Sequence, residues 1–246
     1  MKKIISLFVI IIFTITSTKA SHLPGGNITY ECVGPDQYLV TLTMYEDCQT
    51  GFMTPGSSFT INVVNSCGLP TQVLSATEIV FGNEVSQLCP TAQSTCNGGT
   101  LPGVQEHQYQ VLVTLPGPCD SWTFYHTSCC RNGSVNATST VDDYYFYATL
   151  NNLDAPCNNS PTYTAPPIPY VCSGQSVCYS LGVVEVDGNS LVYSLTEALE
   201  DPALTPVVYS AGYSGANPIP GITIDPATGQ VNFIAPGIVG QYLVVI

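Results

Sequence analysis

Apolar and polar residues alternate one by one along several short stretches of the chain. Apolar faces of this kind are Tyr38, Val40, Leu42 and Met44, then Tyr109, Val111, Val113 and Leu115, and then Tyr144, Phe146, Ala148 and Leu150. A period of two is typical of half-buried β-strands, and no window of a dozen residues repeats apolar positions at helical spacing. Clusters of Gly, Pro and Asn separate the runs, as expected for turns. The pattern predicts an all-β fold, a β-sandwich of many short strands.

The alternation stops in the stretch 151–169, NNLDAPCNNSPTYTAPPIP. Proline withholds backbone donors from a sheet and favours extended chain, so we expect a domain junction near residue 165. A cysteine-rich β-sandwich would occupy residues 21–165. A second domain would occupy residues 166–246, with the hairpin-like runs SLVYSL, GITID, GQVNFIAP and GQYLVVI. The last run stops within an apparent strand, so we expect this second domain to be incomplete at its C-terminus.

Residues 1–20, MKKIISLFVIIIFTITSTKA, have the layout of a secretory signal peptide. Two lysines precede an apolar run, and small and polar residues lead to Ala20, after which we expect cleavage. The apolar run is too short for a membrane span, and no later segment is long and apolar enough to form one. The sequence therefore predicts an exported protein, extracellular or on the outer cell surface, without a transmembrane segment.

Export changes the charge of the chain strongly. The sequence has 4 Lys+Arg and 17 Asp+Glu, and the leader removes Lys2, Lys3 and Lys19. One basic residue, Arg131, then faces the 17 acids, so the net charge of the mature chain is 1 − 17 = −16. Such a surface repels phosphate backbones and anionic lipid, which excludes nucleic-acid binding. We expect Arg131 to pair with a carboxylate or with backbone carbonyls.

All 11 cysteines follow the leader, in a compartment where disulfides form and persist. The disulfide candidates are therefore Cys32, Cys48, Cys67, Cys89, Cys96, Cys119, Cys129, Cys130, Cys157, Cys172 and Cys178. Spacing alone does not assign partners. The odd number leaves three possibilities for one cysteine: a free thiol, an intermolecular bond, or a partner beyond residue 246.

The segment WTFYHTSCCRN places two adjacent cysteines near a histidine and an arginine. Adjacent residues of a strand point to opposite sides, so we expect Cys129 and Cys130 to bond to different partners. A nucleophilic thiol served by His126 is the alternative, since the histidine shares a face with Cys130. We favour disulfides and expect no enzyme and no catalytic residues. A zinc site is disfavoured too, because the cysteine spacings are wide and the histidines are scattered.

Oxygen ligands recur at every second position in the segment VEVDGNSLVY. Glu185, Asp187 and Asn189 could converge on one side around the turn at Gly188, and hard oxygen ligands suit Ca²⁺. Asp225 or Asp201 could complete the set. An ordinary polar turn is the alternative. The chain thus requires no cofactor, with calcium as the one candidate.

Adjacent acids and surface aromatics suggest a link to carbohydrates. The pairs Glu46-Asp47 and Asp142-Asp143 invite a glycosidase interpretation, but neighbours on a strand point apart, so we expect solvated charges at strand ends. Tyr145 and Tyr147 project opposite Tyr144 and Phe146, and exposed aromatics could stack on sugars. Sandwich packing would explain most of the 15 tyrosines.

Several separated motifs resemble one family. SHLPGGNITYEC, QYLVTLTMYEDC, STCNGGTLPGVQEHQY, WTFYHTSCCRN and the linker to PYVC resemble the N-terminal region of large secreted surface proteins of Bacteroidetes. Those proteins are described as gliding-motility-associated or adhesin-like and typically end in a sorting domain for type IX secretion. VEVDGNSLVYSL and IDPATGQVNFIAP resemble cadherin-like or immunoglobulin-like repeats, although Glu185 and Asn189 stand where the repeat prefers aspartates.

The resemblance implies a non-catalytic adhesin-type protein, of which this chain is the N-terminal structural and binding module, and it suggests a link to gliding motility. Its partners would be surface glycans or proteins, and further β repeats of the same polypeptide would follow residue 246. The alternative is a carbohydrate-binding module of a secreted polysaccharide-processing protein, using surface tyrosines and Trp122.

Overall fold

The computed structural model describes residues 23–49, 57–89, 91–138 and 143–246. The predicted signal peptide, residues 1–20, lies outside this part of the chain. Strands account for 44% of the structure and helix for 1%, the latter being the single 3-10 turn η1, Thr95–Asn97. The prediction of an all-β fold is therefore confirmed.

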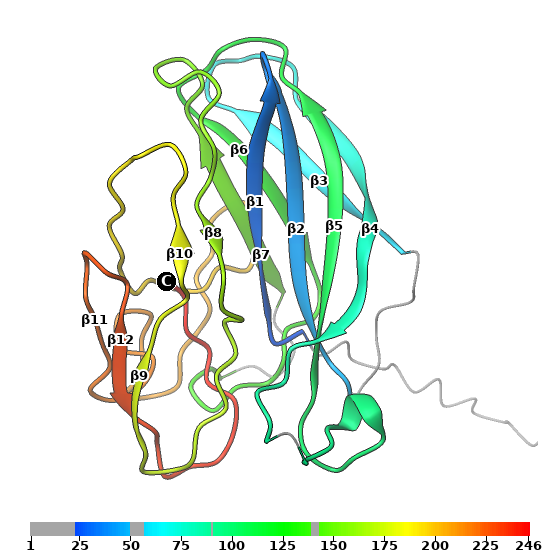
Figure 1. Ribbon diagram of the computed structural model, residues 1–246. Coiled ribbons are helices and arrows are strands. Elements are labelled where there is room, and N and C mark those ends of the chain that lie inside the picture. Colours follow the sequence, from blue (N-terminus) through cyan, green and yellow to red (C-terminus); the bar gives the residue numbers. More distant parts are fainter. Residues whose placement is uncertain (1–22, 50–56, 90, 139–142) are drawn as a thin grey trace, which may run out of the picture.

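One large antiparallel sheet dominates the molecule (Figure 1). Its strand order is β1-β2-β5-β4-β3-β6-β7. The strands are β1 (Gly25–Gly34), β2 (Gln37–Asp47), β3 (Ser58–Asn65), β4 (Gln72–Glu84), β5 (Val104–Thr114), β6 (Trp122–Ser128) and β7 (Tyr144–Leu150). The sheet curls until its two edge strands approach each other, which almost closes it into a barrel.

Contacts between β1 and β7 bring the barrel close to closure. The Tyr30 hydroxyl on β1 donates to the Thr149 carbonyl on β7 over 2.8 Å. Gly26 is required at the same seam, because a Cβ at this position would lie 2.5 Å from the Phe146 ring. The edge strand β1 also bonds to the chain after β7, since Tyr30 and Ser160 exchange hydrogen bonds and the Cys32 backbone donates to Asn159, so part of its backbone is not left unpaired.

The inward faces of the strands form one continuous core. Tyr38, Val40, Leu42 and Met44 of β2 are all fully buried, as the alternation predicts. Phe124 of β6 packs against Tyr30 and Tyr38, with ring centroids 5.4 and 6.4 Å away. Each such side chain stabilises the fold by about 1.5–3 kcal/mol relative to an exposed position. Apolar burial along every strand is therefore the main source of the barrel's stability.

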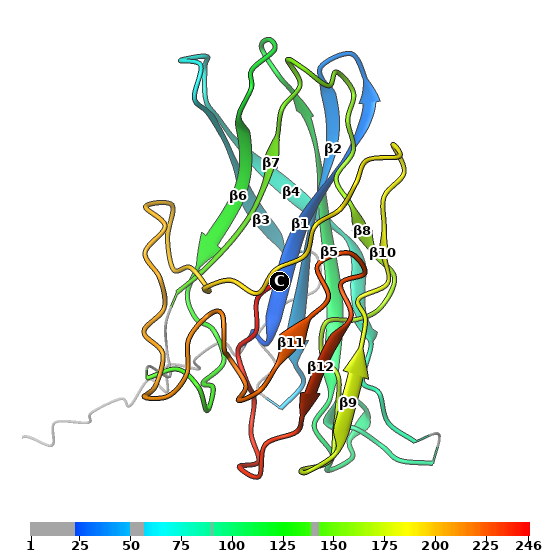
Figure 2. The same ribbon diagram turned by 90° about the vertical axis from the view of Figure 1, so that its left-hand side faces the viewer.

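The chain beyond the barrel forms smaller sheets beside it (Figure 2). The strands are β8 (Thr162–Tyr163), β9 (Ser176–Tyr179), β10 (Val183–Val184), β11 (Thr223–Ile224) and β12 (Val231–Ile234). β8 pairs with β10, and β11-β12-β9 form a three-stranded sheet. GITID and GQVNFIAP pair as expected for a hairpin, whereas SLVYSL forms no strand, and the chain just after it meets Val245 in an isolated bridge at Thr196. We call residues 166–246 the second region.

Residues 131–138, which follow β6 of the barrel, are built into the second region. Asn136 is 0% exposed. Its side-chain amide donates to the carbonyls of Pro218 and Leu243, and its Oδ1 accepts from the Leu243 backbone, all within 2.8–2.9 Å. The backbones of Val135 and Thr138 donate to the carbonyls of Gln241 and Val208. This docking loop joins the barrel to the second region through buried polar contacts.

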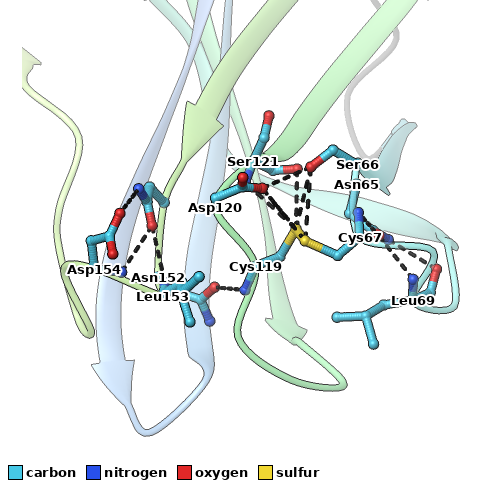
Figure 3. Close-up of a disulfide and its surroundings, with 11 residues drawn as sticks. Asn65, Ser66, Cys67, Leu69, Cys119, Asp120, Ser121, Asn152, Leu153 and Asp154 are labelled. Atoms are coloured by element: carbon cyan, nitrogen blue, oxygen red, sulfur yellow. Dashed lines mark hydrogen bonds between the residues drawn. A yellow bond between two sulfur atoms is a disulfide. The ribbon is translucent and has the colours of Figure 1, made fainter.

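Three disulfides join distant parts of the barrel. They are Cys32–Cys157, Cys48–Cys96 and Cys67–Cys119. Figure 3 shows the last of these beside Asp120, where the Ser66 hydroxyl donates to the Asp120 carboxylate over 2.8 Å. Each bond closes a long loop, which restricts the unfolded chain more than it changes the folded one.

A fourth disulfide joins Cys129 to Cys130, so the prediction that these residues bond to different partners is wrong. The opposite orientation of neighbours holds only within a strand, and β6 ends at Ser128. Eight cysteines are therefore paired in the described chain, while Cys89, Cys172 and Cys178 are free and exposed. The odd total predicted one cysteine without an internal partner, and the described residues contain three.

Candidate functional site

A groove of ≈ 300 Å³ lies between the outer face of the barrel and residues 162–166. One wall is the outer face of β1, β2 and β5, and the other is β8 with the three residues after it. The lining residues are Asn27, Thr29, Thr41, Thr43, Tyr45, Glu106, Gln108, Gln110, Thr162, Tyr163, Thr164, Ala165 and Pro166. Most of these side chains are uncharged hydroxyls and amides.

Strand register arranges the barrel wall of the groove into two rows. Asn27, Thr43 and Gln108 are partners across β1, β2 and β5, and Thr29, Thr41 and Gln110 form the next row. We call these six residues the polar face. They occupy the outward positions of strands whose inward positions fill the core, so the alternation that builds the barrel also creates this face.

Five of the six residues of the polar face are half-buried, whereas Thr43 is 7% exposed and reaches the groove with only a small part of its surface. The Gln110 amide donates to the Thr41 hydroxyl over 3.0 Å, and the Gln108 amide donates to Glu106. None of the hydrogen bonds found among the described residues involves the side chains of Asn27, Thr29 or Thr43. These three side chains can therefore donate to and accept from a bound molecule without breaking an internal contact.

The opposite wall is held in place by the turn before β10. The Thr164 hydroxyl and backbone amide both donate to the Gly182 carbonyl, over 2.8 and 3.1 Å. Gly182 has φ 59°, in the left-handed region, and a Cβ there would overlap the Thr164 side chain. Glycine at this position thus allows the turn to pack directly against Thr164.

Two carboxylates flank the groove. Glu106 lines it beside Tyr45, and Glu31 lines a smaller hollow of ≈ 120 Å³ that shares Thr29, Thr41, Gln110 and Thr162 with it. Burial raises the pKa of the Tyr45 hydroxyl above its ordinary value, and the charge of Glu106 adds to the rise. The groove is therefore neutral along its length and acidic towards its ends.

A buried group of ionisable side chains lies inside the barrel, and the sequence did not reveal it. His107 on β5 contacts Glu78 on β4 through Nδ1 over 2.8 Å and Glu46 on β2 through Nε2 over 3.2 Å. The Tyr109 hydroxyl donates to Glu78 over 3.3 Å. Burial opposes the charge on His107, yet the two carboxylates prevail and raise its pKa. The two carboxylates thus stabilise the imidazolium form against the effect of burial.

This arrangement corrects the expectation that Glu46 and Asp47 are both solvated. The two side chains do point apart, but Glu46 is 4% exposed and faces His107, whereas Asp47 accepts from the Gln49 backbone at the surface. The signal was present in the alternation, because Glu46 continues the inward face of Met44 and His107 continues that of Tyr109. In the other pair, Asp143 is exposed and Asp142 lies outside the described residues.

The second barrel histidine, His126, shows the opposite behaviour. It is 4% exposed, its Nδ1 lies 2.8 Å from the Thr60 carbonyl, and its Nε2 lies 3.4 Å from the Tyr144 hydroxyl. Burial lowers its pKa despite the bond to Thr60. With Cys130 bonded to Cys129, His126 has no thiol to activate there, and the nucleophile alternative does not fit this geometry.

The predicted calcium ligands lie together in one exposed turn. Glu185 accepts from the backbones of Asp187 and Asn189, and the Asp187 carboxylate accepts from the backbone and side chain of Asn159. Asp201 and Asp225 instead cap turns of their own, accepting from Thr205 and from Ala227 and Thr228. The carboxylates are thus engaged by N–H donors, as in a polar turn, and calcium binding stays a prediction.

The aromatic residues divide between core and surface. Trp122 is fully buried, so it cannot stack on a sugar as the carbohydrate-binding alternative supposed. Tyr145 and Tyr147 do lie opposite Tyr144 and Phe146, and their rings stack with centroids 5.1 Å apart. Tyr147 is 48% exposed, whereas Tyr145 is covered where its backbone donates to the Leu199 carbonyl.

Arg131 and a group of two cysteines and one carboxylate are the remaining charged or metal-ligating sites considered. Arg131 is 8% exposed at the start of the docking loop, and its charge helps to lower the pKa of Tyr209, which burial raises more strongly. In the described chain one group of thiols and carboxylates has metal-ligand spacing, namely Cys67, Cys119 and Asp120. Its two sulfurs form a disulfide, which removes them as thiolate ligands.

Compared with protein-family models, curated proteins and solved structures, the chain gives no match. Within the described ranges, no helix has the length and apolar character that crossing a bilayer requires. The four disulfides indicate an oxidising, extracellular environment.

Proposed function

We propose that this chain is a non-catalytic structural and binding module of a secreted or cell-surface adhesin. The observation that carries the proposal is the docking of the barrel onto the second region through the buried Asn136. Buried hydrogen bonds at this joint and disulfides within the barrel favour a stiff unit that presents a fixed outer face. Such a unit suits binding and spacing outside the cell, as the resemblance to Bacteroidetes surface proteins also implies.

The location and role can be tested in cells that produce the full chain. We expect antibodies to label intact cells and protease treatment to remove the label. Deleting the gene should reduce attachment of the cells to surfaces, and restoring the full chain should recover it. A matched control is the Ile11→Asp variant, because a charge in the apolar leader run should prevent export. Label retained inside the cell, or unchanged attachment after deletion, would contradict the proposal.

A second candidate function is a carbohydrate-binding module of a secreted polysaccharide-processing protein. The groove beside the polar face favours it, because uncharged hydroxyls and amides line both walls. An adhesin and a carbohydrate-binding module differ in what deletion affects. Loss of attachment supports the adhesin, whereas slower use of a polysaccharide with normal attachment supports the second candidate.

A further inference from the structure

We propose that the groove between the polar face and residues 162–166 binds an uncharged saccharide. The inference rests on the proposed binding function and assigns it a site and a ligand class. The polar face offers two adjacent rows of neutral side chains across three strands, a surface that matches the closely spaced hydroxyls of a sugar.

Side chains of the groove have hydrogen-bonding capacity that a saccharide could use. Asn27, Thr29 and Thr43 have no side-chain hydrogen bond within the described residues, and each can donate and accept. Across the groove, the exposed Thr162 provides another hydroxyl. A ligand rich in alternating donors and acceptors can satisfy all of them, whereas an apolar ligand would leave them unpaired.

An exposed aromatic ring in the groove also favours a saccharide. Tyr163 lines the groove from β8, and the residue is 42% exposed. An aromatic ring beside polar side chains provides a flat apolar surface with a polar tip. The C–H face of a pyranose can pack on such a ring while its hydroxyls reach the polar face.

Size and shape set the length of the ligand. The groove and the smaller hollow share four residues and follow β1 from Asn27 to Glu31. Four residue steps along a strand span about 13 Å. A volume of ≈ 300 Å³ is near the lower limit of small-molecule sites, roughly 300–1,000 Å³. The site therefore suits a short oligosaccharide or a stretch of a longer chain lying along β1.

Charge selects among saccharides. Glu106 and Glu31 lie towards the two ends, and the full chain has a formal net charge of −13. Sulfated sugars and sugar acids would be repelled by these carboxylates. We therefore expect neutral hexose-containing glycans to bind and acidic glycans to be rejected.

The test uses the full exported chain with its disulfides intact, applied to an array of neutral, sulfated and uronic acid glycans. The strongest neutral glycan is then titrated by calorimetry. We expect the double variant Thr29→Val/Thr43→Val to bind roughly tenfold more weakly, because it loses two hydroxyl contacts. Valine keeps the β-branched shape, so the strands should be retained, and circular dichroism and the melting temperature check this.

Three further variants localise the site. Thr162→Val removes a hydroxyl from the opposite wall and should also weaken binding. Thr149→Val is the matched control, since Thr149 is exposed on β7 and does not line the groove. Tyr147→Ala tests the stacked tyrosines on the outer face of β7 and should leave binding unchanged.

Each outcome is decisive. No binding of any neutral glycan by the folded chain, or equal binding by the Thr29→Val/Thr43→Val variant, overturns the inference and leaves a water-filled crevice. Binding lost in Tyr147→Ala alone would place the glycan on the other surface. An empty array with impaired attachment of deleted cells would refute the groove and retain the adhesin. Groove-dependent glycan binding with normal attachment would refute the adhesin and retain the groove.

Discussion

The barrel and the second region are both all-β, yet they achieve their order in different ways. In the barrel, seven paired strands enclose a continuous core and three disulfides join distant loops. The second region has strands of two to four residues and two small apolar clusters, and its cysteines, Cys172 and Cys178, are free.

The difference indicates which region depends on the other. One of the second region's clusters contains Ala137 of the docking loop beside Ala198 and Val207. The buried Asn136 beside it makes three hydrogen bonds with the second region, donating two and accepting one. Without Asn136, these backbone groups of the second region would lose those bonds. We therefore expect the barrel to be stable by itself and the second region to rely on the barrel.

The largest effect should come from the barrel core. Phe124→Ala removes a fully buried ring that packs against Tyr30 and Tyr38. We expect a loss of about 3–5 kcal/mol in the free energy of unfolding, measured by denaturant titration. Leu112→Ala, at an exposed position of β5, is the control and should change little. If order in the second region survives when the barrel has unfolded, its dependence on the barrel is refuted.

A somewhat smaller effect should follow removal of one disulfide. Cys32 and Cys157 are separated by 125 residues, and their bond ties β1 to the loop before β8. Replacing both with serine should cost about 2–5 kcal/mol, chiefly by freeing the unfolded chain. Thermal unfolding with and without reductant measures this cost. Reductant should lower the melting temperature of the wild type more than that of the double variant.

Breaking the docking loop should separate the two regions. Asn136→Ala leaves backbone groups of Pro218 and Leu243 without partners, a cost of about 2 kcal/mol. Hydrogen exchange should quicken across the second region and stay slow in β2 and β5. Thr138→Val is the control, since it loses one exposed bond to the Val208 carbonyl. Equal acceleration in barrel and second region would contradict the proposed dependence.

Opposite pH responses should distinguish the two barrel histidines. His107 has a raised pKa in the folded state. Its contribution to the free energy of unfolding is therefore complete below its ordinary pKa of 6.5 and is lost as pH rises through the folded value. His126 has a lowered pKa in the folded state, so its contribution to the free energy of unfolding is complete above 6.5 and is lost as pH falls through the folded value. NMR titration of the ring protons should place His107 above 6.5 and His126 below it. Both rings titrating on the same side would refute the opposed environments.

Calcium provides the smallest test, confined to the second region. If Glu185, Asp187 and Asn189 bind Ca²⁺, millimolar calcium should raise the melting temperature, because a ligand stabilises the state that binds it. Asp187→Ala should abolish the rise, whereas Asp201→Ala, which alters a separate turn, should not. No rise at millimolar calcium would leave a turn that serves only to hold Asn159.

Much of the barrel was predictable because strand alternation is a local property. The inward faces of 38–44 and 109–115 and the outward positions of Tyr145 and Tyr147 follow from parity alone. The alternation gave a wrong prediction for Cys129 and Cys130, which bond to each other because the strand ends before them, at Ser128. The same alternation places Glu46 in the interior, although its charge favours a position in solvent.

Residue types and neighbouring positions were enough to predict the all-β class, the outward hydroxyls and amides of 41–43 and 108–110, and the cysteines available for bonding. The pairing of the strands could be seen only in the folded chain, and so could the groove, the trio of Glu46, Glu78 and His107, and the site that receives Asn136. Each of these joins residues far apart along the chain, and their contact depends on how the whole sheet curls.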